Sequence, residues 1–300
     1  MRSAEDYRLR TIADAYYTSD GNSDYVVLAG LEPKDFGIAV HEYVHHVLHS
    51  SGLKVPPCLN EGLAEFFSTL RIVPGMPGHP AEYQLGGDLP ARSQTLQRKK
   101  WLPLAKLLEL PVPETRQDAE LFYAQSWALA DMLVTSSEYS GHFRDLVFEF
   151  NSGTATGLSF YKAYGESLAQ VEQQLKKWIE RPRFAGVISN GGAEMALLHC
   201  TDLSAREEEA LLARLLLVGG HLQQSQARYE EILREWPNDP DAQAALGTIA
   251  LRQGKRAEAL KEWHLAIGNN LTDADLCYRY ALLAEESGVS EQDLKARSCV

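Results

Sequence analysis

The segment His41-Glu42-Tyr43-Val44-His45 combines residue types that can bind a metal ion and activate water. An α-helix advances 100° per residue, so His41 and His45 would project ~40° apart and one turn apart. Two imidazoles at this spacing can reach one metal ion from the same face. Glu42 would point away from the pair, so it is placed to take a proton from a metal-bound water rather than to be a third ligand. The segment therefore predicts a hydrolytic metal site.

A third ligand is available on the next predicted helix. Zinc in catalytic sites usually has three protein ligands and one open position. Glu61 follows His45 beyond a short connection that contains Pro56 and Pro57. Two helices joined in this way can pack antiparallel and bring Glu61 to the metal. Glu65, one turn further, can accept the free N–H of a ligating histidine; the alternative is an ordinary buried or solvated acid.

The elements that position these residues are mostly helical. Apolar residues at helical spacing predict one helix from Asp35, as its N-cap, to a stop at Gly52. A second helix is expected to begin at Asn60 as its N-cap. It is expected to bury four apolar side chains, Leu63, Phe66, Phe67 and Leu70. Residues 25–28 favour a short strand, and the Pro- and Gly-rich residues 73–92 favour a long loop. Further helices are expected at about 103–110, 118–135, 141–151 and 166–180.

A repeat occupies the C-terminal third of the chain. Gly220, Gly254 and Gly288 are evenly spaced, and Tyr229 matches Trp263 in the same register. Ser204 and Glu207 can form a capping box at the start of the first unit. A helix-turn-helix period of about 34 residues resembles the tetratricopeptide repeat. The resemblance covers two full units and a truncated third; the alternative is an unrelated pair of helical hairpins.

Composition excludes several classes of protein. The 300 residues are 45% apolar and 23% charged, which is typical of a soluble globular chain of two domains. A net charge of -12 argues against nucleic acid as a partner. No apolar run is long enough to span a membrane, and the N-terminus lacks the apolar core of a signal peptide. We therefore expect the chain to be cytoplasmic as it stands, or periplasmic or secreted if it is a fragment without its leader.

The two histidines followed by the segment Asn60-Glu61-Gly62-Leu63-Ala64-Glu65 resemble the gluzincin metallopeptidases, which include thermolysin-like, aminopeptidase N-like and bacterial peptidase-MA-like enzymes. By that resemblance His41, His45 and Glu61 bind Zn²⁺, Glu42 is the general base, and Glu65 orients a ligand histidine.

The aminopeptidases of this group also carry a tyrosine that stabilises the tetrahedral intermediate. Tyr123, which follows Glu61 on a later predicted helix, fits that role, and its alternative is a plain core tyrosine. No Gly-x-Met-Glu-Asn segment precedes the histidines, so an endopeptidase or a specialised peptidase is expected rather than an exopeptidase. His46 and His49 share the motif helix, but a helix cannot aim four imidazoles at one ion. They are expected to line a pocket or lie on the surface.

These observations define an expected fold class and domain order. The chain is expected to be mainly α, with a zincin-like α+β catalytic domain that has a short N-terminal strand region. The catalytic domain would span residues 1–185, its N-terminal part incomplete, and residues 186–203 would form a linker. A tetratricopeptide-like repeat module would follow over residues 204–300.

Three functional hypotheses follow. The favoured one is a zinc metallopeptidase that cleaves a peptide or protein substrate and whose repeats bind a protein partner. The second is a non-catalytic interaction or scaffold protein that uses the repeats alone. The third is zinc-dependent hydrolysis of a non-peptide bond.

Overall fold

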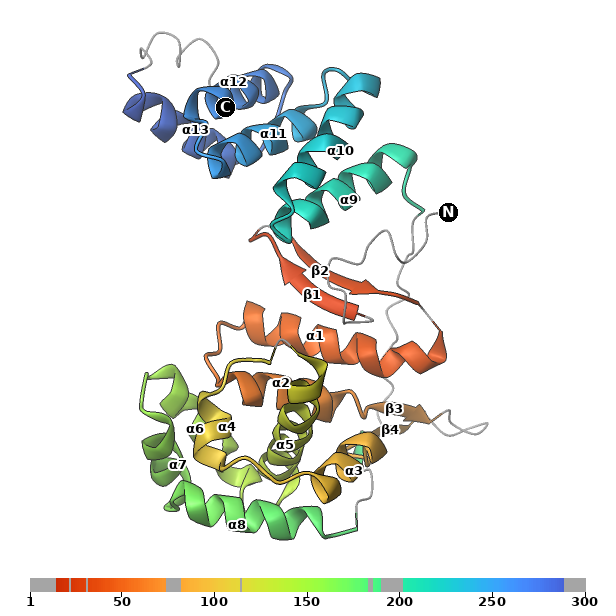
Figure 1. Ribbon diagram of the computed structural model, residues 1–300, viewed down its shortest axis with the longest axis vertical. Coiled ribbons are helices and arrows are strands. Elements are labelled where there is room, and N and C mark those ends of the chain that lie inside the picture. The colour runs from red at the N-terminus through yellow and green to blue at the C-terminus, as the bar shows by residue number, and fades with distance from the viewer. Residues whose placement is uncertain are drawn as a thin grey trace. The chain divides into compact units, whose positions relative to one another are not determined.

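The computed structural model describes residues 15–21, 23–30, 32–73, 82–113, 115–182, 186–189 and 202–288 (Figure 1). They divide into two compact units, one made of the described residues up to 189 and the other of those from 202 onward. Helices predominate in both, which confirms the mainly α part of the predicted fold class. Among these residues, no helix combines the length and the apolar character needed to cross a membrane.

The first unit combines helices with two small antiparallel sheets. Its elements, in chain order, are β1 (Ala15–Ser19), β2 (Asp24–Leu28), α1 (Phe36–Ser50), α2 (Pro57–Phe67), β3 (Arg71–Val73), β4 (Glu82–Leu85), α3 (Pro90–Arg98), α4 (Leu104–Glu109), α5 (Arg116–Thr135), α6 (Phe143–Asn151), α7 (Thr156–Tyr164), α8 (Leu168–Ile179) and β5 (Gly186–Ser189). Strands β1 and β2 form a hairpin that packs on α1. Strands β3, β4 and β5 form the second sheet in that order.

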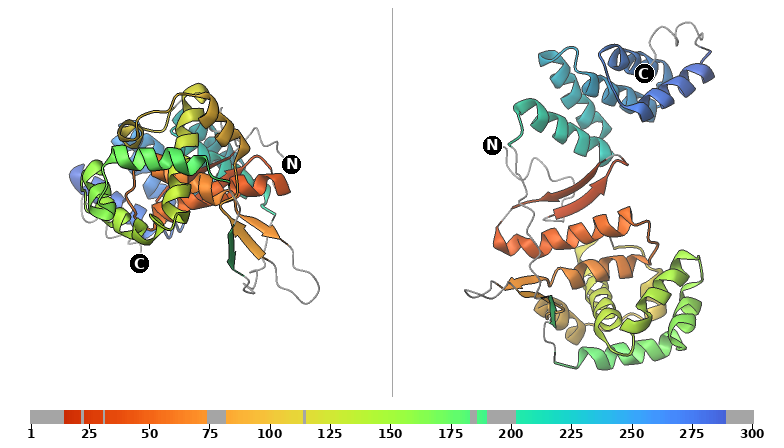
Figure 2. Two further views of the ribbon diagram at one scale, coloured as in Figure 1. Left: turned by 90° about the horizontal axis from the view of Figure 1, so that it is seen from below. Right: turned by 180° about the vertical axis from the view of Figure 1, so that it is seen from behind.

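Strand β5 joins segments that lie far apart in the sequence. It pairs antiparallel with β4, with Leu85 opposite Gly186, and Figure 2 shows the green β5 beside the orange β4. Residues 186–189 belong to the predicted linker 186–203, and in the structure they complete a sheet of the first unit. Residues 190–201 of that predicted linker lie outside the described residues.

The core of the first unit is built around α5. Phe122, Trp127 and Leu129 on this helix are fully buried, as is Leu59 on α2. Helices α2 and α5 cross closely because a glycine, Gly62, stands at the crossing. A Cβ atom there would lie 2.2 Å from the carbonyl oxygen of Ser126 on α5. The glycine therefore lets α2 pack directly on the backbone of α5.

One of the two helices of the motif begins earlier than predicted. Helix α1 ends as predicted, with Gly52 just beyond it at a φ of +66°. Helix α2 does not begin at Asn60 but at Pro57, so the prediction of Asn60 as N-cap is wrong. Proline is well suited to the first helical position, where its fixed φ is helical and no N–H is needed. Asn60 thus lies one turn inside the helix.

Two further expectations for this region need correction. Phe67 was predicted to be buried, but it is the last residue of α2 and 36% of it is exposed. Residues 73–92 were predicted to be one loop, yet β4 lies within them and α3 begins at Pro90. Helix α7 was not predicted either. The four helices expected further along the chain correspond to α4, α5, α6 and α8.

The second unit consists of helix pairs packed side by side. Its helices are α9 (Ala205–Val218), α10 (Leu222–Glu235), α11 (Pro240–Arg252), α12 (Arg256–Gly268) and α13 (Ala274–Glu286). Gly220, Gly254 and Gly288 follow α9, α11 and α13 at φ of +81°, +80° and +73°. The period of the sequence repeat thus places a glycine in the left-handed conformation at equivalent turns. Tyr229 and Trp263 are buried between the helices, as predicted.

The start of the second unit is also as predicted. The Ser204 side chain accepts a hydrogen bond from the Glu207 N–H, and the Glu207 carboxylate accepts one from the Ser204 N–H, which completes the capping box. The truncated third unit expected at the end of the repeats corresponds to α13, and its last residues, 289–300, lie outside the described residues.

Candidate metal centre

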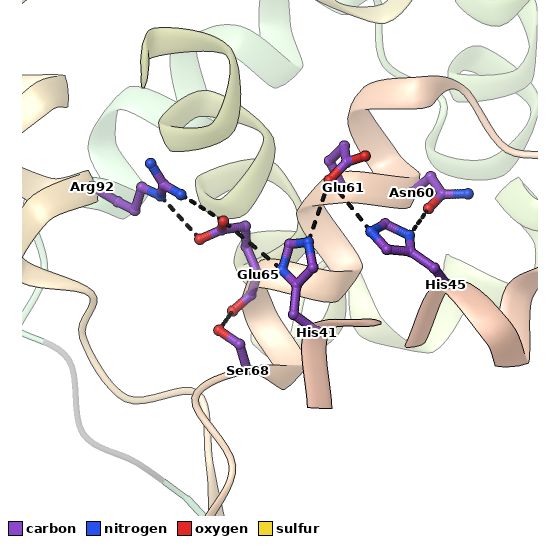
Figure 3. A network of polar contacts seen from close by, with 7 residues as sticks. All are labelled: His41, His45, Asn60, Glu61, Glu65, Ser68 and Arg92. Atoms are coloured by element: carbon purple, nitrogen blue, oxygen red, sulfur yellow. Dashed lines mark hydrogen bonds and ion pairs between the residues drawn. The ribbon is translucent and has the colours of Figure 1, made fainter. Parts of the chain in front are cut away.

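Helices α1 and α2 bring together the three residues that were predicted as ligands. His41 and His45 lie one turn apart on α1, with ring centroids 4.9 Å apart. Glu61 on α2 faces both rings (Figure 3). One ligand atom from each of the three residues can be chosen so that all lie within 4.8 Å of one another. Within the described residues, this is the His/Cys/Asp/Glu group with a geometry that could hold a metal ion.

The carboxylate of Glu61 provides a test of whether a cation fits here. Its Oε2 atom lies 3.5 Å from Nε2 of His41 and 3.5 Å from Nε2 of His45. This oxygen is buried and has no hydrogen-bond partner. A buried polar atom without a partner is costly, and a cation between the three groups would remove that cost. Two imidazole nitrogens and one carboxylate oxygen also suit the ligand preference of Zn²⁺.

The charge of Glu61 dominates the ionisation of this group. Burial alone would raise the pKa of Glu61, but the neighbouring imidazoles of His41 and His45 outweigh it and lower the pKa to about 2. Burial would lower the pKa of His45, and the opposing charge of Glu61 raises it overall. Glu61 is therefore ionised at neutral pH, which is the form that binds a metal ion.

Asn60 orients one of the two histidines. Its Oδ1 lies 2.5 Å from Nδ1 of His45, so Nδ1 carries the proton and donates to the amide oxygen. In the neutral imidazole, Nε2 of His45 then carries the lone pair, and this nitrogen faces Glu61. This arrangement matches the general pattern in which a ligand histidine donates its other N–H to a fixed acceptor. The role was missed because Asn60 was interpreted as a helix cap.

Glu65 lies near the other histidine but is held mainly by another residue. Its Oε1 is 3.9 Å from Nδ1 of His41, which is beyond hydrogen-bond length. Its stronger partner is Arg92 on α3, which donates from Nε to Oε2 at 2.9 Å and from Nη2 to Oε1 at 2.6 Å. Sequence analysis missed Arg92 because it falls in the segment predicted to be a loop.

The predicted catalytic residues line the same pocket as the three candidate ligands. Glu42 and Tyr123 border a cavity of about 390 Å³ together with His41, His45 and Glu61. Residues of β1, of α1, of the loop after it and of α2 complete the lining: Ala15, Tyr16, Tyr17, Leu48, His49, Leu53 and Asn60. Proton-transfer and hydrogen-bonding groups thus share one cavity with the candidate ligands.

Tyr123 is half-buried in an acidic environment. Burial raises the pKa of its hydroxyl, and the charges of Glu61 and Glu65 raise it further. Its ring lies 5.2 Å from Cζ of Arg92, a distance typical of cation–π contacts. Tyr123 is therefore a protonated hydrogen-bond donor at neutral pH.

The remaining histidines of α1 lie outside the ligand group. His46 places Nδ1 3.3 Å from Oδ2 of Asp24 on β2, and its ring centroid lies 5.9 Å from that of Tyr17. His49 is exposed and lines the pocket. Both positions agree with the expectation that these histidines line a pocket or the surface rather than bind the metal.

Comparisons of this chain with protein-family models, curated proteins and solved structures find no match.

Proposed function

We propose that this chain is a zinc-dependent metallopeptidase of the gluzincin type. The observation that carries the proposal is the convergence of His41, His45 and Glu61 on one point. At that point lies the buried Oε2 atom of Glu61, which has no hydrogen-bond partner. Glu42 and Tyr123 in the same cavity supply the two further groups that hydrolysis of a peptide bond needs. Because three protein residues form the set, a fourth position stays open, as in catalytic zinc sites.

Each group has a distinct task in this proposal. Zinc held by the three ligands would lower the pKa of water and polarise the scissile carbonyl. The Glu42 carboxylate accepts the proton of the attacking water and delivers it to the leaving amine. The Tyr123 hydroxyl donates a hydrogen bond to the oxygen on which negative charge develops.

The peptidase is proposed to be an endopeptidase or a specialised peptidase rather than an exopeptidase. The support is the sequence before the histidines, which carries no Gly-x-Met-Glu-Asn segment. Ala15, Tyr16 and Tyr17 of β1 line the pocket and are the residues of this strand that a substrate would meet.

We also propose that the second unit consists of tetratricopeptide-like repeats that bind a protein partner. The support is the helix pairs packed side by side and the evenly spaced glycine turns. Gly247 adds to it, because a Cβ atom there would lie 2.3 Å from the ring of Trp263. Small and large residues thus alternate at the contact between α11 and α12, as repeat packing requires.

Metal analysis and a peptide-cleavage assay would test the proposal. The parent protein should contain one zinc per chain and cleave members of a broad peptide library. His41→Ala and Glu61→Ala should lose the metal. Glu42→Gln should keep zinc and its melting temperature but lose ~10²–10⁴-fold in activity, because glutamine cannot accept a proton. Glu109→Gln, an exposed substitution on α4, is the matched control.

The outcomes separate the three hypotheses. Zinc binding without cleavage of any peptide would favour hydrolysis of another bond. A protein that binds no zinc would favour the non-catalytic interaction protein. Activity of Glu42→Gln within a few-fold of the parent would remove Glu42 from the mechanism.

A further inference from the structure

Arg92 reaches two sides of the candidate site with one side chain. Its guanidinium donates two hydrogen bonds to the Glu65 carboxylate of α2 in a bidentate arrangement. Its Cζ atom lies 5.2 Å from the ring centroid of Tyr123 on α5. Figure 3 shows the guanidinium directed at Glu65, with His41 on the other side of that carboxylate. One residue of α3 thus contacts groups on two other helices.

The chain of contacts runs from Arg92 to a candidate ligand. The Oε1 atom of Glu65 that accepts from Arg92 is also the atom 3.9 Å from Nδ1 of His41. The Glu65 side chain is only 10% exposed, and that of Arg92 28%. A carboxylate buried to this degree needs a charged partner, and the planar fork of arginine fixes its rotation as well as its charge. Without Arg92, the Oε1 atom would no longer be fixed beside His41.

The second contact fixes the ring of Tyr123. A cation against one face of an aromatic ring attracts it and restricts its rotation. The Tyr123 hydroxyl must hold one direction relative to Glu61 and His41 to act on a developing oxyanion, and small displacements are costly in such sites. Arg92 therefore acts on the ligand side and on the hydroxyl side at once.

We propose that Arg92 is a positioning residue that holds Glu65 beside His41 and Tyr123 over the pocket, an inference that rests on the proposed function for the role of Tyr123. Arg92 does not itself line the pocket, but its contact partner Tyr123 does. It acts through Glu65 and Tyr123.

The test uses the full chain with Arg92→Gln, Arg92→Lys and the control Arg98→Gln, an exposed position on the same helix. Zinc affinity is measured by competition with a chromophoric chelator, and kcat and KM on one cleaved peptide. Arg92→Gln should lose ~10-fold in zinc affinity and ~10–100-fold in kcat, with KM changed less than ~3-fold. Arg92→Lys keeps the positive charge but lacks the planar guanidinium that forms two hydrogen bonds. On a logarithmic scale it should recover less than half of the loss in zinc affinity and less than half of the loss in kcat. Arg98→Gln should equal the parent.

A double-variant comparison tests the route of the effect. In the Tyr123→Phe background, Arg92→Gln should lower kcat less than it does in the parent, because the hydroxyl it positions is already gone. Full additivity of the two changes would overturn the link to Tyr123.

The readouts keep this inference apart from the proposed function. If the parent binds zinc but cleaves no peptide, the proposed activity fails, and zinc affinity alone tests the inference. A lower zinc affinity in Arg92→Gln then supports the inference, and a zinc affinity equal to that of the parent overturns it. If the parent is active, parental zinc affinity and kcat in Arg92→Gln overturn it. Should Arg92→Gln fail to fold, Arg92→Lys decides by the same measurements, and parental values in it overturn the inference.

Discussion

Replacing Gly62 with alanine tests whether the close crossing of α2 and α5 holds the metal centre together. A Cβ atom at this position would lie 2.2 Å from the carbonyl oxygen of Ser126, 2.7 Å from its carbonyl carbon and 3.2 Å from Cβ of Ala130. Ordinary contacts of this kind are 3.4–4 Å long. Two of the three atoms belong to the backbone of α5, which cannot rotate away. The two helices must therefore separate by ~1 Å.

The size of the effect follows from two opposing contributions. Overpacking of a buried site costs ~1–3 kcal/mol, and the collision with backbone atoms places Gly62→Ala at the upper end. Alanine is the better helix former by ~1 kcal/mol, which offsets part of the loss. The expected net loss in the free energy of unfolding is ~2 kcal/mol, which corresponds to a melting temperature lower by ~4–8 °C for a unit of this size.

The same displacement should reach the ligands. Glu61 precedes Gly62 on α2, so moving the helix shifts the carboxylate relative to His41 and His45. Sites of this kind tolerate shifts of only ~0.5 Å. Zinc affinity should therefore fall by ~10-fold or more, in addition to the loss of stability.

Thermal unfolding and zinc competition on one matched pair of variants would check both effects. Gly157 is the control, since it is an exposed glycine in α7 and a Cβ atom there would meet only Leu168, at 3.7 Å. Gly157→Ala should be neutral or slightly stabilising and leave zinc affinity unchanged. A Gly62→Ala protein that melts within ~1 °C of the parent would refute the close crossing.

Two further predictions concern Tyr123 and Cys58. Tyr123→Phe should lower kcat by ~10²–10³-fold with little change in KM or melting temperature, as steady-state kinetics would measure. Tyr161→Phe, an exposed control, should match the parent. A normal kcat in Tyr123→Phe would show that Tyr123 is only a packing residue. Burial raises the pKa of the Cys58 thiol from 9.0 to about 12, so the fold favours the neutral thiol. The resulting stabilisation is complete below about pH 9 and is lost as the pH rises toward 12. Denaturant titrations above pH 9 should therefore show that the free energy of unfolding falls faster with pH in the parent than in Cys58→Ala. Parallel pH profiles of the two free energies of unfolding would contradict this prediction.

The juxtaposition of the two candidate ligand histidines could be predicted from the sequence because it depends only on helix geometry. His41 and His45 are four residues apart, and the 3.6-residue turn places them on one face whatever surrounds the helix. The position of Glu61 needed only a short connection between two helices. The glycine turns of the second unit were equally predictable, because a left-handed conformation at Gly220 and Gly254 follows from local stereochemistry.

The groups that orient the site depend on tertiary structure and were missed for that reason. Arg92 meets Glu65, which lies 27 residues earlier in the chain, through a helix in a segment whose prolines and glycines favoured a loop. The start of α2 was predicted three residues too late, at Asn60, because Asn60 is a good capping residue. The helix begins instead at Pro57, since proline is well suited to the first helical position. A helix start at Pro57 was the signal that could have placed Asn60 on the inner face of α2.

The spacing of residues on α5 connects the helix crossing with the chemistry. Tyr123 and Ser126 are three residues apart, so they lie on adjacent turns of the same face. Ser126 is the point where Gly62 meets α5, and Glu61 is the neighbour of Gly62 on α2. The distance between the Glu61 carboxylate and the Tyr123 hydroxyl is therefore set by how closely the two helices cross. A larger residue at position 62 would widen the cavity between them, so the glycine that follows Glu61 acts as a geometric requirement of the site rather than as a flexible position.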